Sequence, residues 1–386
     1  MTRRSVQEYA ASVRQRYRRA KKPEKGKILD EFCATTGLHR KAVIRLLSSD
    51  SWPVVARRGR PRRYGPEVVG PLRLVWEMSD RMCGKLLVAV MADLIAALER
   101  HGELRLSFEV REKLLGMSAS TIDRLLKKQS IRLSNLKPKR KAAAQSLKAE
   151  VPIRTWSEWR GVKPGSLQAD LVLHCGESLE GFFLTTLTAV DVATGWIELQ
   201  PIWGLGKTRV GTGIHLVRQR LPFTLAALHT DNGGEFINDL LIPWCRREGI
   251  SYSRGRAYRK NDQAWVEQRN WQSVRRHVGY ERYSTRAAYE LLLKLYPLLC
   301  LQMNFFRPVR KLVDKGRQGA RVVKRYDEPQ TPYQRLLAAA VLSEADQARI
   351  AKHLLALNPA ELQRQIDQLL HQLWQQAEGK MGAKAR

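Results

Sequence analysis

The stretch SLQADLVLHC at residues 166–175 decides the fold, because it is an apolar run of strand length with one carboxylate, Asp170, near its centre. Burying a carboxylate among apolar side chains costs free energy unless a partner compensates its charge. Two further strands are predicted downstream, at residues 182–192 and 195–203, with a tight turn between them. The run therefore predicts the first strand of a sheet that carries a functional acid.

The elements that follow alternate between helix and strand. We expect a helix at residues 208–220 and a strand at 225–229, then a helix at 235–248 and a short strand near 250–253, and finally a helix at 263–278. Three antiparallel strands followed by alternating helices and strands form the order of ribonuclease-H-like folds. The sequence predicts an α/β core with a mixed five-stranded sheet and flanking helices.

Two more acids are placed to join Asp170. Asp231 follows the strand at 225–229 and precedes two glycines, which let a ligand approach the backbone. Glu267 lies in the first turns of the helix at 263–278. Carboxylates that converge from separate elements, in a segment of near-zero net charge, are typical of a divalent-metal site.

Two of these regions resemble motifs of the retroviral-integrase superfamily. Residues 229–236, HTDNGGEF, resemble its second-aspartate motif, and residues 261–270, NDQAWVEQRN, resemble its glutamate motif. Thirty-five residues separate Asp231 from Glu267, as in the D,D(35)E members, and residues 165–176 match the first-aspartate strand. Residues 304–312 and 331–335 resemble the tail of insertion-sequence transposases of the ISNCY-like group.

The resemblance implies a DDE transposase in which Asp170, Asp231 and Glu267 bind two Mg²⁺ ions, with Mn²⁺ as a substitute. These residues would catalyse DNA nicking and strand transfer by direct attack, without a covalent protein–DNA intermediate. The implied partners are double-stranded DNA, as element ends and as target, and further copies of the chain in a homo-oligomer on DNA. Retroviral integrases begin with a His/Cys zinc module that has no counterpart here, so helix-turn-helix units are expected to recognise the terminal inverted repeats.

Other acids compete for these roles. Asp191 is the main rival of Asp170, but its place just before Gly195 favours a role in capping the turn. Glu235 is expected to begin a helix, where a carboxylate favours the positive end of the helix dipole. Asp262 is expected to lie in a loop or cap.

Three polar residues near these acids have open roles. His174 and His229 lie in predicted strands, where packing or hydrogen bonding is favoured over metal binding. Asn270 lies one turn beyond Glu267 and contacts either the DNA end or a neighbouring side chain.

The charge is segregated along the chain. The net charge is +31, of which residues 1–150 carry +19 and residues 251–325 carry +13, whereas residues 151–250 carry −1 and residues 326–386 carry none. Two basic blocks around a neutral one are typical of a protein that holds a polyanion on two surfaces. No apolar run approaches the roughly 20 residues of a membrane span, and five scattered cysteines fit a reducing compartment. We expect a cytoplasmic, nucleoid-associated bacterial protein with no membrane partner.

The first basic block contains two helix-turn-helix candidates, at residues 27–47 around Gly37 and at residues 110–126 around Gly116. Between them, residues 57–63, RRGRPRR, resemble an AT-hook, an arm that lays Arg side chains into the minor groove. The alternatives are a plain helical hairpin for each candidate and a solvated linker for the arm. Taken over the whole chain, the candidate DNA contacts are Arg40, Lys41, Arg45, Arg58, Arg60, Arg62, Arg124, Lys127, Arg254, Arg256, Arg259, Lys260 and Asn270.

The second basic block surrounds the glutamate helix. Arg254, Arg256, Arg259 and Lys260 precede this helix, and further basic residues, Arg269, Arg275, Arg276 and His277, continue along it. We expect these side chains to meet substrate phosphates, the alternative being a solvated basic face. Residues 307–326 are spaced for short strands, as a small DNA-contacting barrel or an extended connector.

The tail is expected to be helical. Helices begin at Ser343 and at Asn358, and the second carries an apolar stripe. The stripe, which packs on the catalytic domain or forms a subunit contact, comprises Leu362, Ile366, Leu369, Leu370 and Leu373.

These observations predict the following organisation: a helix-turn-helix at residues 1–56, an AT-hook-like arm at 57–65, a second helix-turn-helix module at 66–135, a basic linker at 136–160, a catalytic domain at 161–304, a basic segment at 305–335 and C-terminal helices at 336–386. The predicted function is a transposase that binds terminal inverted repeats and carries out metal-dependent nicking and strand transfer. The alternatives are a sequence-specific DNA-binding regulator on an inactive core, and a nuclease that cuts without joining.

Overall fold

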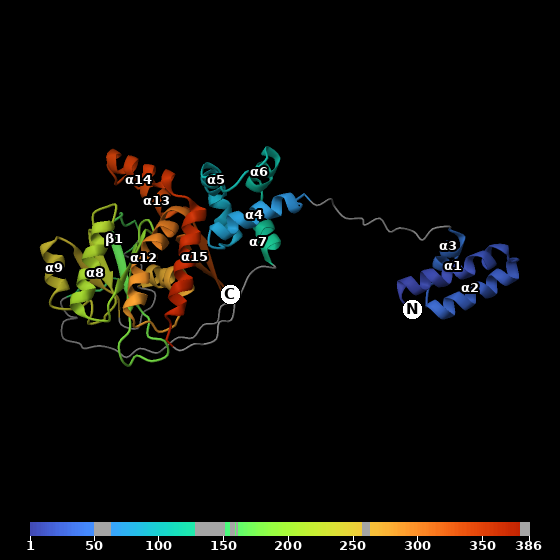
Figure 1. Cartoon of the computed structure of the whole chain (residues 1–386), viewed down its shortest axis with the longest axis horizontal. Coiled ribbons are helices and arrows are strands. Elements are labelled where there is room, and N and C mark those ends of the chain that lie inside the picture. Colours follow the sequence, from blue (N-terminus) through green and yellow to red (C-terminus); the bar gives the residue numbers. More distant parts are fainter. Residues whose placement is uncertain (50–62, 128–150, 155–158, 160, 257–262, 379–386) are drawn as a thin grey trace. The chain divides into compact units, whose positions relative to one another are not determined.

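The computed structural model describes residues 1–49, 63–127, 151–154, 159, 161–256 and 263–378 (Figure 1). The chain divides into two compact units, Met1–Arg63 and Tyr64–Arg386. The predicted AT-hook residues Arg58, Arg60 and Arg62, and most of the predicted linker at 136–160, lie outside the described residues.

The first unit contains three helices, α1 (Arg3–Arg19), α2 (Lys22–Thr36) and α3 (Arg40–Ser48). Gly37 ends α2 with a φ of 72°, a left-handed conformation that glycine adopts without strain, so the chain turns sharply into α3. Phe32, Val43 and Leu47 are fully buried where the three helices meet. The two helices that the sequence predicts around Gly37 are therefore present, and they have their own small core.

The second unit begins with four helices, α4 (Pro66–Met78), α5 (Gly84–Arg100), α6 (Phe108–Leu115) and α7 (Ala119–Leu126). Ser118 caps α7 by accepting a hydrogen bond from the Thr121 amide, as its place before the helix predicts. The amide of Gly84, at the start of α5, donates to Asp123 of α7 at 2.7 Å. Helix α5 is the inner helix of the four, with Leu87, Leu94, Ile95 and Leu98 fully buried.

A five-stranded sheet forms the centre of the second unit. Its strands are β1 (Ser166–Leu173), β2 (Thr185–Asp191), β3 (Ile197–Ile202), β4 (Ala227–Thr230) and β5 (Ser251–Arg254), in the order β3-β2-β1-β4-β5. Neighbours β1, β2 and β3 pair antiparallel, whereas β4 is parallel to both β1 and β5. This mixed sheet has the predicted ribonuclease-H-like order, so the predicted fold class is confirmed.

Two helices connect the later strands, α8 (Lys207–Arg220) and α9 (Leu241–Arg247). The prediction that a helix begins at Glu235 is wrong, because α9 begins six residues later. Asn238 explains the difference: its side-chain oxygen accepts hydrogen bonds from the amides of Leu240 at 3.0 Å and Leu241 at 2.9 Å. Residues 233–240 therefore form a loop that the Asn238 side chain holds in place.

The helix that carries Glu267 is irregular. It consists of α10 (Ala264–Arg269), a π-helical stretch η5 (Asn270–Arg275) and α11 (Arg276–Val278). Helix α12 (Arg286–Leu301) follows and continues as the π-helical η6 (Gln302–Phe306). The C-terminal helices are α13 (Pro332–Ala338), α14 (Glu344–Ala356) and α15 (Pro359–Gln375).

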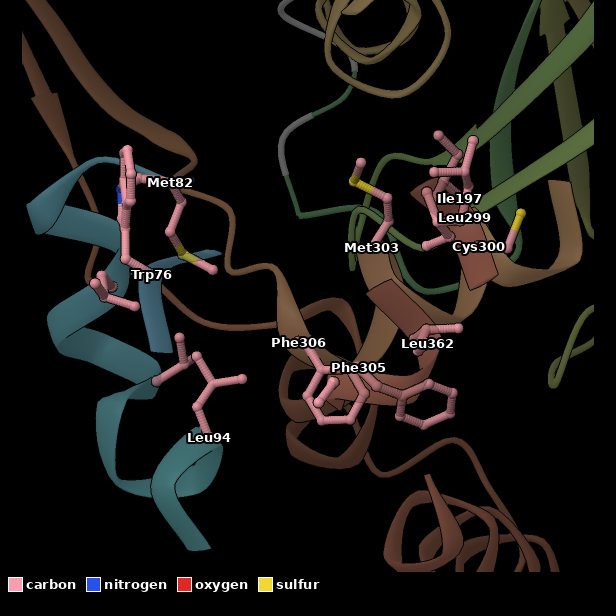
Figure 2. Close-up of a cluster of buried hydrophobic side chains, with 14 of the residues drawn as sticks. Trp76, Met82, Leu94, Ile197, Leu299, Cys300, Met303, Phe305, Phe306 and Leu362 are labelled. Atoms are coloured by element: carbon pink, nitrogen blue, oxygen red, sulfur yellow. The ribbon is translucent and has the colours of Figure 1, made fainter. Parts of the chain in front are cut away.

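One hydrophobic cluster joins the N-terminal helices of this unit to the sheet and to the C-terminal helices. Figure 2 shows Trp76 and Leu94 of α4 and α5 on one side and Ile197 of β3 with Phe305 and Phe306 of η6 on the other. Helix α15 packs along α12 and also contacts α4 and α5. Its apolar stripe is thus buried within the chain, which favours the packing alternative over a subunit contact.

Strands β6 (Leu312–Gln318) and β7 (Arg321–Tyr326) form an antiparallel hairpin. Every residue of the hairpin except the half-buried Leu312 is exposed. The sequence allowed either a small barrel or an extended connector in this segment. The structure shows a two-stranded ribbon instead. Among the described residues, no helix is both long and apolar enough to cross a bilayer.

Candidate active site

The sheet places two of the three predicted acids on neighbouring segments. Strands β1 and β4 pair in parallel, and their register ends with Gln168 opposite His229, two residues before Asp170 and Asp231. Asp170 points from the middle of β1, and Asp231 follows the last residue of β4. Both side chains are half-buried. Since neighbouring strands lie about 4.8 Å apart, the backbone segments that carry the two acids are close to each other near the carboxyl end of β4.

The third acid lies on a helix that is bound to β1. The side-chain oxygen of Gln168 accepts a hydrogen bond from the Val266 amide at 3.4 Å, which fixes the start of α10 on the strand. One turn further, the side-chain amide of Asn270 donates to Oδ2 of Asp170 at 2.7 Å. Glu267 is exposed between these two anchoring points. The structure therefore assigns Asn270 a local contact with Asp170.

The loop after β4 contacts the second of these acids. Oδ1 of Asp231 accepts a hydrogen bond from the Gly233 amide at 2.9 Å. A Cβ at Gly233 would lie 2.4 Å from a carboxylate oxygen of Glu235 and 3.0 Å from Oδ1 of Asp231, so glycine lets both side chains lie close to this backbone. Arg254 donates to Asn232 at 3.0 Å and thereby ties the loop to β5.

The donor set fits a hard divalent cation, because Mg²⁺ prefers carboxylate oxygens. Asp170 on β1 and Asp231 just after β4 provide such oxygens from two neighbouring strands. Among the described residues, however, no group of three or more His, Cys, Asp and Glu side chains is gathered closely enough to hold a metal ion.

Asp191 has the turn-capping role that its position predicts. It is fully buried and accepts hydrogen bonds from the amides of Gly165 at 2.9 Å, Ser166 at 3.1 Å and Thr194 at 2.8 Å. Burial raises the pKa of its carboxyl, and these hydrogen bonds act in the opposite direction. Asp191 holds the ends of β1 and β2 together and faces away from solvent.

The two strand histidines are structural. Nε2 of His174 lies 2.7 Å from the Thr186 hydroxyl, and burial, with a smaller effect of Arg275, lowers the pKa of His174 to about 3. Nδ1 of His229 lies 3.0 Å from the Ser253 hydroxyl, and its ring packs edge-on against Trp159. The contacts of both histidines agree with the prediction of packing and hydrogen bonding and not with metal binding.

The predicted DNA contacts lie in different environments. Lys41 and Arg45 are exposed on α3, and Arg124 and Lys127 are exposed on and just after α7. Arg40 forms an ion pair with Asp30. Arg254 donates hydrogen bonds to the Val151 carbonyl and to the Asn232 side chain, whereas Arg256 is exposed. Arg259 and Lys260, like Asp262, lie outside the described residues.

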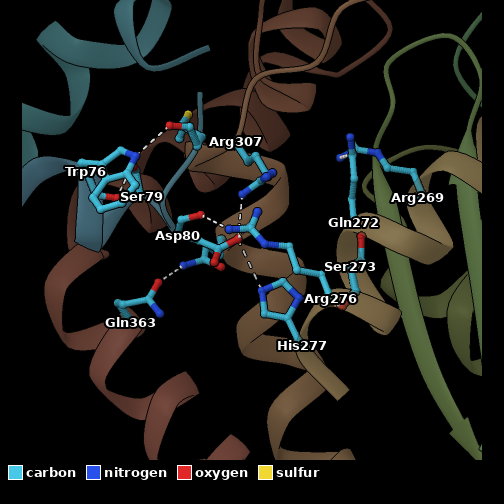
Figure 3. Close-up of polar contacts among 12 residues, drawn as sticks. Trp76, Ser79, Asp80, Arg269, Gln272, Ser273, Arg276, His277, Arg307 and Gln363 are labelled. Atoms are coloured by element: carbon cyan, nitrogen blue, oxygen red, sulfur yellow. Dashed lines mark hydrogen bonds and ion pairs between the residues drawn. The ribbon is translucent and has the colours of Figure 1, made fainter. Parts of the chain in front are cut away.

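Several basic residues beyond Glu267 point inward, contrary to the expectation that they meet phosphates. Arg276 and His277 both contact the Asp80 carboxylate, at 3.1 and 3.4 Å (Figure 3). Arg275 donates to the Leu173 carbonyl at 2.9 Å. For Arg276 and His277 the physical reason is that Asp80, in the loop between α4 and α5, is itself nearly buried and contacts both side chains.

Sequence reasoning missed Asp80, whose carboxylate is also 2.7 Å from Nη1 of Arg307. Burial acts to raise its pKa, but His277, Arg307 and Arg276 outweigh burial and bring the pKa of Asp80 to about 2. The carboxylate therefore stays charged and joins α4 and α5 to the helix of Glu267. No local pattern signals this contact, because Arg276 and Arg307 lie far from Asp80 in the sequence.

Comparison with known proteins adds three findings. No protein-family model matches the chain. The chain is 43% identical over 329 residues to "Uncharacterized protein y4rM" of Sinorhizobium fredii, with 85% of this chain and 94% of that protein covered.

Two solved structures resemble part of this chain. The catalytic core domain of BIV integrase has a TM-score of 0.28 and 20% identity, over 49% of this chain and 98% of that one. The HTLV-2 integrase catalytic core domain, in complex with magnesium, has a TM-score of 0.29 and 14% identity, over 39% and 93%. Both TM-scores are low, so the fold assignment rests on the strand order and directions described above.

Proposed function

The chain belongs to the same family as protein y4rM of Sinorhizobium fredii, and we propose that it is an insertion-sequence transposase of the DDE class. In this proposal it binds terminal inverted repeats, nicks the DNA at the element ends and joins those ends to target DNA. The observation that carries the proposal is the parallel pairing of β1 with β4, because these neighbouring strands lead to Asp170 and Asp231. Its placement in the ISNCY-like group rests on the motif resemblance at residues 304–312 and 331–335.

We assign Asp170, Asp231 and Glu267 as the residues that would hold two Mg²⁺ ions, or Mn²⁺ as a substitute. Such ions activate the attacking oxygen and stabilise the leaving oxygen of a phosphoryl transfer. The chain's own contribution is positioning: Asn270 orients the Asp170 carboxylate, and Gln168 fixes the start of the Glu267 helix. Asn270 is thus a positioning residue that acts through Asp170.

We assign DNA binding to basic side chains on both units. Helix α3 follows a glycine turn, and Lys41 and Arg45 on its exposed side suit a helix that enters the major groove. On the second unit, Arg124 and Lys127 lie on and just after α7. Minor-groove contact is assigned to the AT-hook-like arm at residues 57–63.

Transposition handles two element ends together, so we infer a homo-oligomer that assembles on DNA. Such an assembly acts on the bacterial chromosome, which agrees with the expected cytoplasmic, nucleoid-associated location. The overall charge of +31 supports this, because it favours association with a polyanion over association of free protomers.

The decisive experiment is strand transfer of a labelled, pre-cut repeat end into plasmid DNA with Mg²⁺ or Mn²⁺. Pull-down of genomic fragments with the full chain supplies the repeat sequence. Wild type is compared with Glu267→Gln, which keeps the size of the side chain and removes its charge. We expect joined product from wild type and at least a hundredfold less from the variant, because a metal ligand is lost, with DNA binding equal in both.

The other outcomes identify the alternatives. Cut product without joined product in wild type would assign the chain as a metal-dependent nuclease. Equal DNA binding with no product from either protein would contradict the transposase proposal and favour a DNA-binding regulator on an inactive core.

A further inference from the structure

A cavity of about 280 Å³ lies beside α10, on a different face from Glu267. Helix α10 contributes Trp265, Gln268 and Arg269 to its walls, and the continuing η5 contributes Gln272. Their spacing of three, four and seven residues defines one face of a helix. Glu267 and Asn270 are not among the lining residues, so the cavity is separate from the space between Asp170 and Asp231.

The walls of the cavity are strongly basic. The lining residues include five cations and no Asp or Glu, the cations being Lys85, Arg269, Arg307, Arg310 and Lys311. Only Arg307 among them has a carboxylate partner at ion-pair distance within the described residues, namely Asp80. Like charges repel, so an anion in the cavity would reduce the repulsion between these side chains.

Among these cations, Arg269 is both deeply buried and without a carboxylate partner in the described part of the chain. Its side chain is 4% exposed and donates to the Gly195 carbonyl at 2.9 Å and to the Gln272 side chain at 3.5 Å. Both partners are neutral, and no carboxylate of the described residues forms an ion pair with it. Burial and the nearby Arg307 and Arg335 lower its pKa, with no acid to oppose them. A buried charge without a counter-ion is costly in free energy, and an anionic ligand would offset this cost.

Other donors converge on the same cavity. The Lys311 ammonium donates to the Ala193 carbonyl at 2.7 Å and lies 5.7 Å from the centre of the Trp265 ring. Burial and Arg335 lower the pKa of Lys311, whereas Asp191 and Asp327 act to raise it. Nε1 of Trp265 is buried and finds no acceptor among the described residues. The cavity therefore offers a guanidinium, an ammonium and an indole N–H to a ligand that has acceptor atoms and negative charge.

We propose that this cavity binds a phosphate group of the DNA strand on which the acids act. The inference deepens the proposed function and rests on it. A phosphate diester carries a full negative charge and only acceptor oxygens, which matches the donor-rich walls. Helix α10 is about 10 Å across and lies between the cavity and Glu267, so the bound phosphate is one other than the phosphate being cut.

Binding of inorganic phosphate to the full chain tests the site itself. Calorimetry is done in EDTA, so that metal-dependent chemistry plays no part. We compare wild type with Arg269→Gln and with Arg310→Gln at the cavity wall, and use Arg105→Gln, an exposed arginine elsewhere, as the matched charge control. We expect phosphate binding at least tenfold weaker in the two cavity variants and unchanged in the control. Arg269→Gln should also melt no lower than wild type without phosphate, because it removes an uncompensated buried charge. Equal phosphate binding in all four proteins would overturn the proposal.

Binding to DNA distinguishes the source of the phosphate. A labelled duplex with a single-stranded overhang is substituted, one linkage at a time, with neutral methylphosphonate, again in EDTA. The proposal expects one linkage whose neutralisation weakens wild type at least tenfold and leaves Arg269→Gln unchanged. If phosphate binding depends on Arg269 but no such linkage exists, the cavity serves a free phosphate compound and its assignment to DNA is overturned. Because neither assay needs metal or turnover, failure here is distinct from failure of the strand-transfer test.

Discussion

At the scale of single residues, the contact between Asn270 and Asp170 decides how the first acid is presented. The 2.7 Å hydrogen bond comes from the residue one turn beyond Glu267, so two proposed metal ligands are linked through one helix. The Leu171 amide donates to the other oxygen, Oδ1, at 2.8 Å, so the two hydrogen bonds together fix the orientation of the carboxylate. Such outer contacts commonly change metal affinity or activity by 10- to 100-fold.

Asn270→Ala is therefore expected to lower strand transfer by about 10- to 100-fold, because the Asp170 carboxylate loses its orientation. The measurement is strand transfer across a Mn²⁺ titration, together with DNA affinity in EDTA. We expect the Mn²⁺ requirement to rise and DNA affinity to stay constant. A loss of DNA affinity with an unchanged Mn²⁺ requirement would instead assign Asn270 to the DNA end. Gln372→Ala, an exposed amide on α15, is the control.

At the scale of elements, the β6–β7 ribbon has a charge pattern that opposes its own pairing. Lys315 stands directly opposite Lys324 across the two strands, and like charges at such positions are destabilising. Arg317, Arg321 and Arg325 add to the same exposed ribbon, with Asp314 as its one acid. A two-stranded ribbon fits the major groove of DNA, whose phosphates would neutralise these cations.

We predict that Lys315→Gln combined with Lys324→Gln reduces the salt dependence of DNA binding. Each lost phosphate contact lowers the slope of log affinity against log salt by about 0.9, so the double variant should lose about 2. Affinities are measured at about 50 to 300 mM KCl, where counter-ion release dominates the salt dependence of binding. Lys352→Gln, on α14, is the control and should leave the slope unchanged. A slope in the double variant equal to that of wild type would exclude the ribbon from DNA contact.

The elements also show where sequence patterns suffice. The order of the five strands and the caps at Ser118, Ser343 and Asn358 could be predicted, because alternation and capping are local signals. The start of α9 could not, because the Asn238 side chain competes with helix formation at a site where Glu235 has a good helix-starting pattern. Asp170 and Asp231 could be paired through strand order, whereas the position of Glu267 depends on contacts with β1 that no spacing reveals.

At the scale of the whole molecule, Asp80 links regions more than 190 residues apart in the sequence. It joins the α4–α5 loop to Arg276 on the Glu267 helix and to Arg307 after η6. The residue has a φ of 55°, which Asp tolerates better than most side chains. The inward turn of Arg276 and His277 follows from this long-range partner, which is why the basic pattern along the helix predicted their environment wrongly.

Asp80→Asn is expected to lower the free energy of unfolding of the second unit by about 3 kcal/mol, because Arg307 and Arg276 remain buried without their counter-charge. Urea unfolding at pH 7 measures the change. Asp346→Asn, which removes an exposed ion pair with Arg349, is the control and should cost less than about 1 kcal/mol. A loss as small as that of the control would show that the Asp80 cluster does not hold the unit together.

The same cluster predicts an acid dependence of stability. The pKa of Asp80 is lowered from 3.8 to about 2, so its contribution is present above the ordinary carboxyl pKa and is lost as the pH falls from about 4 to 2. The shift corresponds to about 2 kcal/mol. Urea unfolding at pH 5, 4 and 3 should show this loss in wild type and a correspondingly smaller loss in Asp80→Asn. Parallel pH curves for the two proteins would contradict the assignment.

The burial of α15 has a consequence for synthesis of the chain on the ribosome. The three helices of Met1–Arg63 contact one another only over short sequence distances, so this unit folds soon after it emerges. The second unit closes its core with Leu362, Ile366 and Leu373, which pack against helices made much earlier. At about 5–20 residues per second, the nascent chain presents a finished N-terminal unit for on the order of tens of seconds before the second unit is complete. In the proposed function, the N-terminal unit can therefore engage DNA close to its own gene before the unit that carries the three acids has closed its core.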